Sequence, residues 1–142
     1  MTPNELARIH AAAFTQARPW SAKEFTDLVQ SPHVHLTANP AGFALWRAVA
    51  GEAELMTIAV APEYQGKGHG DALMRAWMTA ARDLAETAFL EVAADNHAAL
   101  RLYEKAGFTT NARRRAYYPR DAGESVDAIV MRATLAAIIP QA

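Results

Sequence analysis

The chain has 142 residues, of which 51% are hydrophobic and 20% charged, a composition typical of one folded globular domain. With 14 Lys and Arg residues against 15 Asp and Glu residues, the formal net charge of -1 argues against a surface for stable nucleic-acid binding. No cysteine is present, which excludes disulfides, thiolate metal ligands and a cysteine nucleophile. No apolar run is long enough for a membrane span and no leader pattern opens the chain, so we expect a cytoplasmic protein without a membrane partner.

The first third of the chain predicts two helices followed by two strands. The first helix is expected over residues 3–14, where apolar positions recur at helical spacing. The S-x-x-E pattern of Ser21 and Glu24 is a capping box, which predicts a second helix that ends near residue 29. Two strands are expected, over residues 33–37 and 42–49, and residues 38–41 are expected to form the turn that joins them.

The remaining two thirds alternate strands with helices. Strands are expected over residues 54–60, 87–92, 108–118 and 127–134, and helices over residues 71–85 and 97–106. Asn96 is a good N-cap for the last helix, and Gly107 is a good C-terminal cap. Strands separated by helices imply that some strands pair in parallel, so we expect a single mixed α/β domain over residues 1–142.

The most informative stretch lies between the expected strand at 54–60 and the long helix that follows it. It reads Gln65-Gly66-Lys67-Gly68-His69-Gly70. Alternate glycines allow a sharp turn and a close approach of backbone N–H groups to a ligand, and the positive end of a helix favours an anion such as a pyrophosphate. The glycine spacing differs from the Walker and dinucleotide motifs. The stretch therefore predicts an anion site of another kind, the alternative being a glycine-rich turn without a ligand.

This stretch resembles the acetyl-CoA loop of the Gcn5-related N-acetyltransferase (GNAT) superfamily, whose pattern Q/R-x-x-G-x-G/A is matched by Gln65, Gly68 and Gly70. A second part of the family signature follows in order, as LEVAADNHAALRLYEKAGF. The tail ARRRAYYPRDAGESVDAIVM is similar to the branch that acetylates the N-terminal alanine of a ribosomal protein. The resemblance implies a mixed central sheet flanked by helices. Because this chain opens on a helix, either the family's usual N-terminal strand is missing or the chain begins too late to include it.

The resemblance also implies where the substrates and the reacting groups lie. Residues expected to bind acetyl-CoA come from one strand end, the glycine-rich loop and a helix cap, and are Ile58, Ala59, Val60, Gln65, Gly66, Lys67, Gly68, His69, Gly70, Asp71 and Asn96. Glu91 is expected to take the proton of the acceptor amine, through a water molecule, and Tyr103 to protonate the sulfur of CoA. The alternatives are a structural Glu91 paired with an arginine and a Tyr103 that serves as a core aromatic residue.

The expected function is therefore transfer of the acetyl group from acetyl-CoA to a protein N-terminal α-amine, by direct attack while both substrates are bound. The resemblance names the N-terminal alanine of a small-subunit ribosomal protein as acceptor. A small-molecule N-acetyltransferase acting on a polyamine, an aminoglycoside or an amino acid is the first alternative. A CoA-binding module without catalysis is the second.

Several groups outside the signature keep two interpretations. The run Arg113-Arg114-Arg115, with Arg120, is either a solvated hairpin edge or a contact for a CoA phosphate or for ribosomal RNA. Aromatic residues that either line a peptide groove or cover the core are Trp20, Tyr117 and Tyr118. Acidic residues expected to form a rim that attracts a basic acceptor are Glu24, Asp27, Glu52 and Asp127. His33 and His35 share a strand face without an evident third ligand, so no metal is expected.

Overall fold

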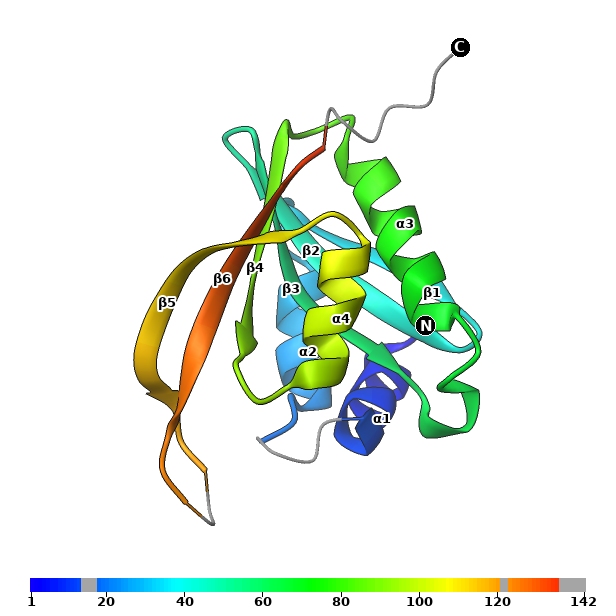
Figure 1. Ribbon diagram of the computed structural model, residues 1–142. Helices are drawn as coiled ribbons and strands as arrows, with labels where there is room; N and C mark the ends of the chain where they lie inside the picture. Colours follow the sequence, from blue (N-terminus) through cyan, green and yellow to red (C-terminus); the bar gives the residue numbers. More distant parts are fainter. Residues whose placement is uncertain (14–17, 121–122, 136–142) are drawn as a thin grey trace.

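The structure is a computed structural model that describes residues 1–13, 18–120 and 123–135. Its helices are α1 (Pro3–Ala13), α2 (Ala22–Val29), α3 (His69–Ala81) and α4 (His97–Lys105), with a short 3-10 turn η1 (Pro62–Tyr64). Its strands are β1 (Val34–Asn39), β2 (Gly42–Val49), β3 (Glu52–Val60), β4 (Thr87–Ala93), β5 (Thr109–Tyr118) and β6 (Val126–Thr134). These strands form one sheet in the order β1-β2-β3-β4-β6-β5 (Figure 1).

The strand pairing is mixed, which confirms the expectation of some parallel pairing. β3 and β4 run parallel, and the other neighbouring strands run antiparallel. The parallel pair is short, because its register covers only Glu52–Glu54 against residues 87–89. Beyond these residues the two central strands separate, and this separation positions the site described below.

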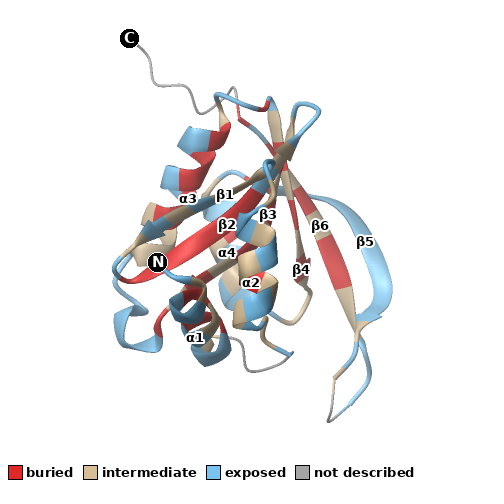
Figure 2. Ribbon diagram, turned by 180° about the vertical axis from the view of Figure 1, so that it is seen from behind, coloured by how far each residue is buried: buried red, intermediate tan, exposed pale blue. Residues whose placement is uncertain are grey.

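Helices cover the sheet on both faces. α3 and α4 pack on one face through a buried cluster that contains Trp77 and Tyr103. α1 and α2 pack on the other face through a cluster built around Phe25 and Phe43. Figure 2, seen from behind, shows α1 and α2 in front of the sheet, and shows pale, exposed β5 at the far edge. The two clusters enclose the β2 and β3 strands between helices, which explains their nearly continuous apolar sequence.

Strand β3 changes the face that it buries at a β-bulge. Leu45 pairs with Thr57 and Trp46 with Leu55, which leaves Met56 as the extra residue. Before the bulge, Leu55 belongs to the cluster under α3 and α4, whereas Ala59, after it, belongs to the cluster under α1 and α2. Without the extra residue these odd-numbered positions would all face one side of the sheet. The bulge therefore re-aims the last third of β3, the part that borders the gap beside β4.

Local signals in the sequence are confirmed at several element ends. Ser21 accepts a hydrogen bond from Glu24 N, and the Glu24 side chain accepts one from Ser21 N, so the capping box is formed. Gly107 follows α4 with a left-handed φ of 103°. The turn between β1 and β2 is shorter than expected. Asn39 Oδ1 closes it by accepting hydrogen bonds from the backbone N–H groups of Ala41 and Gly42.

The long helix differs from its expected range, residues 71–85, at both ends. α3 begins at His69 instead of residue 71, because Gly68, with φ 85°, already acts as its N-cap. It ends at Ala81, and Leu84, which lies inside the expected helix, is 52% exposed in the turn that follows. The first helix is described as far as Ala13, and the expected last residue, Phe14, lies outside the described residues.

Candidate active site

A cavity of about 730 Å³ lies where β3 and β4 separate. Its wall combines β3, β4, the glycine-rich loop, the first turns of α4, and the end of β5. In the described residues the β4-facing edge of β3 has no strand partner beyond Glu54. Backbone N–H and C=O groups on that edge are therefore available to an extended ligand. Of the predicted acetyl-CoA residues, those on this wall are Ile58, Ala59, Val60, Gln65, Gly66, Gly68, His69, Gly70 and Asn96.

The glycine-rich loop adopts a backbone that suits an anion. Gly66 and Gly68 have left-handed φ angles of 77° and 85°, where a side chain is strained. Gln65 Nε2 donates a hydrogen bond of 3.0 Å to Val60 O, which fastens the loop to the end of β3. The N–H groups of the first turn of α3 precede the first helical hydrogen bond, from Ala72 N to Gly68 O. These donors and the positive end of the helix favour a phosphate at this corner of the cavity.

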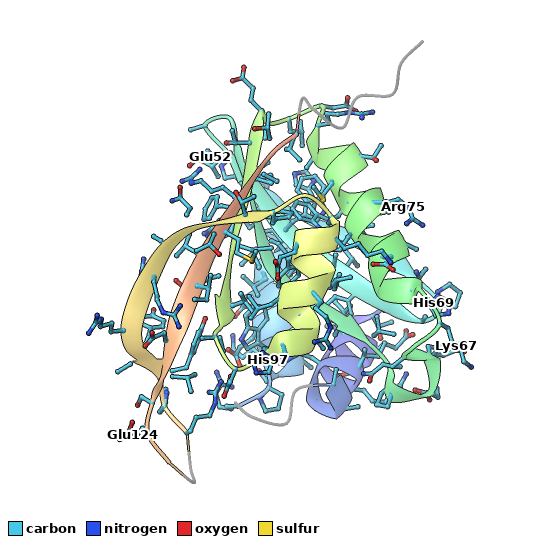
Figure 3. All side chains as sticks on the ribbon, in the orientation of Figure 1. Glu52, Lys67, His69, Arg75, His97 and Glu124 are labelled. Carbon is cyan, nitrogen blue, oxygen red and sulfur yellow. The ribbon has the colours of Figure 1, made fainter. Side chains whose placement is uncertain are left out.

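Three predicted loop residues differ in their surroundings. Gly70 belongs to α3 and has no left-handed φ, but a Cβ there would lie 3.4 Å from Leu102 Cδ1, so its space is limited. Lys67 is exposed at the outside of the loop (Figure 3) and is not on the cavity wall. Asp71 is not on the wall either, since its carboxylate accepts a hydrogen bond of 3.0 Å from Lys105 Nζ and so links α3 to α4.

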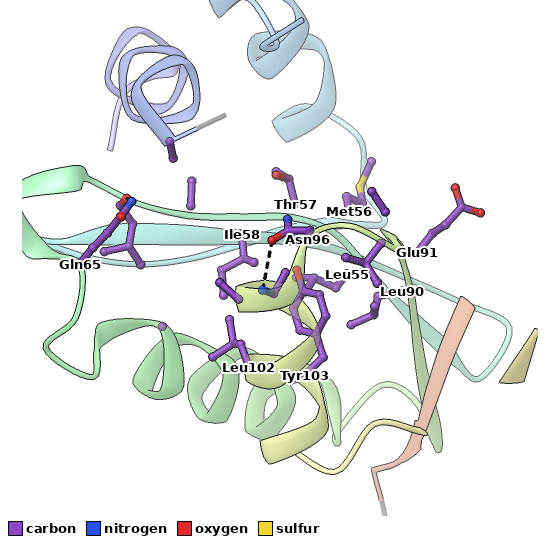
Figure 4. Close-up of a pocket in the computed structure, with 18 of the residues that line it drawn as sticks. Leu55, Met56, Thr57, Ile58, Gln65, Leu90, Glu91, Asn96, Leu102 and Tyr103 are labelled. Atoms are coloured by element: carbon purple, nitrogen blue, oxygen red, sulfur yellow. Dashed lines mark hydrogen bonds between the residues drawn. The ribbon is translucent and has the colours of Figure 1, made fainter. Parts of the chain in front are cut away.

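Tyr103 projects from α4 into the cavity between the separated strands (Figure 4). Its side chain is 8% exposed, and its ring packs beside Phe108 with 6.4 Å between the ring centroids. Burial raises the pKa of the Tyr103 phenol to about 12, so the hydroxyl keeps its proton at neutral pH. Within the described residues the hydroxyl has no hydrogen-bond partner, and it is not sealed from the cavity. The hydroxyl is therefore protonated and makes no hydrogen bond within the described part of the fold.

Glu91 lies on the opposite side of β4 from Tyr103. Its neighbours Leu90 and Val92 belong to the cluster under α3 and α4, so alternation along the strand turns Glu91 to the other face. Figure 4 shows its side chain directed away from Tyr103. Tyr118 Oη donates a hydrogen bond of 3.0 Å to Glu91 Oε1. The cavity thus presents a carboxylate from one face of the sheet and a phenol from the other, and the expected arginine neighbour, Arg114, is also present, with Nε 3.7 Å from Oε2.

Asn96 combines two tasks at the start of α4. Its Oδ1 accepts a hydrogen bond of 3.2 Å from Ala99 N, which confirms it as the N-cap (Figure 4, dashed line). The same residue lines the cavity. Because the cap uses only the side-chain oxygen, the amide nitrogen keeps its capacity to donate a hydrogen bond.

A buried histidine organises the cavity wall on the α1 side, and the sequence pattern identified it only as one position of an amphipathic helix. His10 is 1% exposed, and its Nδ1 accepts a hydrogen bond of 3.0 Å from Trp20 N. The ring hydrogen must then be on Nε2, which donates a hydrogen bond of 3.2 Å to Thr57 Oγ1. The imidazole also stacks on Trp20, with 5.0 Å between ring centroids. Trp20 and Thr57 both line the cavity, so His10 joins α1 to two of its walls.

The neutral state of His10 predicts a pH-dependent stability. Burial lowers the pKa of His10 to about 4, against 6.5 in the unfolded chain, although the nearby Glu24 carboxylate opposes this change. Between these pH values the unfolded chain binds more protons, so the free energy of unfolding falls as the pH falls from 6.5 to 4, by up to about 3 kcal/mol. Urea unfolding at pH 7, 5.5 and 4.5 checks this. His10→Gln should flatten the slope, and His97→Gln, at an exposed site, should leave it unchanged; an equal slope in all three proteins would contradict the prediction.

The expected acidic rim is not present as a set of free carboxylates. Each of the four residues is held by a cation of the same chain, in the pairs Arg18–Glu24, Lys23–Asp27, Arg132–Glu52 and Arg113–Asp127. None of the four lines the cavity. Two further arginines of the expected basic run are engaged as well: Arg114 lies over the Tyr117 ring, and Arg120 binds Asp95 through two hydrogen bonds. Much of this surface is therefore self-paired.

No group of three or more His, Cys, Asp or Glu residues among the described residues has the arrangement of a metal site. No helix in the described ranges combines the length and the apolar character of a membrane span.

Residues 4–108 match the acetyltransferase (GNAT) family. The chain belongs to the GNAT acetyltransferase family. It is 40% identical over 131 residues to the [ribosomal protein bS18]-alanine N-acetyltransferase of Escherichia coli (strain K12), covering 88% of this chain and 87% of that one. It is 37% identical over 135 residues to the N-alpha-acetyltransferase RimI of Mycobacterium tuberculosis, covering 89% and 82% of the two chains.

Solved structures confirm the fold. The ribosomal-protein-S18-alanine N-acetyltransferase from Escherichia coli matches with a TM-score of 0.80 and 38% identity, over 91% of this chain and 84% of that one. A chimera of the spermidine N-acetyltransferase SpeG matches with a TM-score of 0.81 at 20% identity, which shows a shared fold alone. The chain therefore has the GNAT fold and is an acetyl-CoA-dependent N-acetyltransferase, and the fold by itself does not select between protein and small-molecule acceptors.

Proposed function

We propose that the chain is a single cytoplasmic acetyltransferase domain that acetylates a protein N-terminal α-amine, with the N-terminal alanine of ribosomal protein bS18 as its acceptor. The observation that carries this proposal is the 40% identity, over 88% of the chain, to the Escherichia coli enzyme named for that activity. The 38% identity to the solved structure of that type supports it. The fold alone indicates N-acetylation of an amine and does not identify that amine.

The cavity offers acetyl-CoA a binding surface that matches its chemistry. Backbone groups of Ile58, Ala59 and Val60 lie on the open edge of β3, where they would bind the amide-rich arm of CoA. The left-handed loop and the first turn of α3 would hold the pyrophosphate, and Asn96 would contact the arm from the other side. Acetyl-CoA supplies the reactive thioester, and the chain supplies its orientation.

Glu91 on β4 and Tyr103 on α4, which lie on opposite sides of β4, divide the proton transfers between them. The α-amine attacks as a neutral nitrogen, and Glu91 takes the proton that this nitrogen loses as the new C–N bond forms, directly or through water. Tyr103 gives a proton to the sulfur as the C–S bond breaks, so the products are an N-acetylated chain and the free thiol. An α-amine has a pKa of about 7.7–8.0, against about 10.4 for lysine, so a carboxylate is an adequate base for this acceptor.

A panel of four acceptors tests the proposal. It comprises a bS18 peptide that begins Ala-Arg, the same peptide with a blocked terminus and a free lysine, the same peptide with glutamate at the second position, and spermidine. We expect the unblocked bS18 peptide to have the highest kcat/KM, with a rate that rises with pH and levels off near the α-amine pKa. Mass spectrometry locates the acetyl group. A higher kcat/KM for spermidine or for the blocked lysine peptide would overturn the proposal.

The second-position comparison addresses specificity separately. Because the expected acidic residues are already paired with Arg18, Lys23, Arg132 and Arg113, we expect little discrimination between a basic and an acidic second residue. A strong, salt-sensitive preference for the basic peptide would indicate that these pairs open on binding.

A further inference from the structure

The end of β5 contributes a side chain to the cavity that neither motif of the signature contains. Tyr118 is half-buried there, and its hydroxyl donates the hydrogen bond of 3.0 Å to Glu91 Oε1. Burial, and next the neighbouring Glu91 carboxylate, raise the pKa of Tyr118, so this hydroxyl is a donor at any working pH. The second oxygen of the carboxylate, Oε2, lies 3.7 Å from Arg114 Nε, which is beyond hydrogen-bond distance. The two carboxylate oxygens therefore differ: Oε1 accepts a hydrogen bond from Tyr118, whereas Oε2 accepts none from the described residues.

Tyr118 is itself held from two directions. The guanidinium of Arg120 lies over its ring, 5.9 Å from the centroid, and the Tyr117 ring meets it edge to face with 5.2 Å between centroids. Arg120 in turn binds Asp95 with hydrogen bonds of 2.9 and 2.8 Å, and Asp95 immediately precedes the N-cap of α4. The end of β5 is thus joined to the loop between β4 and α4. Because the Tyr118 hydroxyl is held in place, it can restrain the Glu91 carboxylate that accepts its hydrogen bond.

We propose that Tyr118 is a positioning residue for Glu91, whose carboxylate it holds by Oε1 so that Oε2 accepts the proton of the acceptor amine. The inference rests on the proposed role of Glu91. A glutamate side chain has three rotatable torsions, and an unrestrained carboxylate would spend much of its time away from the reacting nitrogen. One fixed oxygen removes most of that freedom without blocking the other oxygen. Tyr118 acts through Glu91 and not on the substrate.

Kinetics of matched tyrosine variants test the inference. Tyr118→Phe removes only the hydroxyl, and Tyr117→Phe is its control, because Tyr117 is an exposed neighbour whose ring and not its hydroxyl makes the described contacts. We expect Tyr118→Phe to lower kcat for the bS18 peptide about tenfold, with KM for the peptide and for acetyl-CoA changed less than twofold. Tyr117→Phe should retain the wild-type kcat. A Tyr118→Phe protein with a kcat within twofold of wild type would overturn the inference.

A double-mutant cycle distinguishes positioning from direct contact with the acceptor. If Tyr118 acts through Glu91, Tyr118→Phe should cause no further loss in a Glu91→Gln protein, whose slow turnover is followed by product accumulation. The same tenfold loss in that background, or a rise in the peptide KM in place of a fall in kcat, would overturn the positioning role in favour of acceptor contact. A Glu91→Gln protein with wild-type turnover would overturn both the proposed base and the inference, whereas full Tyr118→Phe activity beside a deficient Glu91→Gln would overturn the inference alone.

Discussion

Tyr103→Phe is expected to lower kcat by about 10²–10⁴-fold while leaving the KM for acetyl-CoA nearly unchanged. The phenol is buried, it keeps its proton because burial raises its pKa to about 12, and its hydroxyl has no partner among the described residues. A hydroxyl without a structural hydrogen bond can be removed at little cost in stability, and phenylalanine fills the same space beside Phe108. The loss should therefore fall on the proton transfer to the sulfur.

Steady-state kinetics with the bS18 peptide, together with thermal unfolding, measure both sides of this prediction. The melting temperature of Tyr103→Phe should stay close to that of the wild type, so that the kinetic effect is not a folding effect. Tyr64→Phe offers a control, because Tyr64 is exposed on η1 although it also lines the cavity. Near wild-type turnover of Tyr103→Phe would show that another group, or solvent, protonates the sulfur.

Gly68→Val is expected to weaken acetyl-CoA binding about 100-fold or more. Gly68 combines a left-handed φ of 85° with the N-cap position of α3, and a β-branched residue is strongly disfavoured in that conformation. The loop must then adopt another path, which removes N–H groups from the anion corner. Each lost hydrogen bond to a charged phosphate is worth about 1.5–3 kcal/mol, so the loss of two accounts for the expected change.

Gly51→Val provides the matched control for this loop. Gly51 has a similar left-handed φ of 81° and open space around it, but it lies in the turn between β2 and β3 and is not on the cavity wall. Both variants should lose stability, and only Gly68→Val should lose acetyl-CoA affinity, as measured by calorimetry on proteins that circular dichroism shows to be folded. Unchanged affinity in a folded Gly68→Val protein would remove the loop from the binding site. Gly70 is a weaker test, because its backbone is helical.

Features that depend on a few neighbouring residues could be predicted from the sequence. The Ser21 capping box, the Asn96 cap and the left-handed glycine after α4 all involve groups within about four positions of one another, so their chemistry is visible in the order of residues. The glycine-rich loop belongs to this class. The residues proposed to bind acetyl-CoA were predicted largely because most of them are consecutive in the chain.

The carboxylates show where that reasoning failed. Glu24, Asp27, Glu52 and Asp127 were expected to face an acceptor, yet each pairs with a basic residue of the same chain. Arg132 and Glu52 are 80 positions apart, so no local pattern connects them. An acidic residue in the sequence carries no sign of its partner, because ion pairs form between whichever side chains the sheet brings within reach.

The remaining features arise from the strand arrangement. The Met56 bulge moves later β3 residues to the other face of the sheet, and the nearly continuous apolar sequence of this strand gives no sign of that change. The bond from Tyr118 to Glu91 joins residues 27 positions apart, and that from His10 to Thr57 joins residues 47 apart. Both bonds join elements that are distant in the sequence and that only the folded arrangement brings together. Local chemistry therefore specified the loop and the helix ends, whereas long-range strand pairing brought the carboxylate, its tyrosine and the opposing phenol together around one cavity.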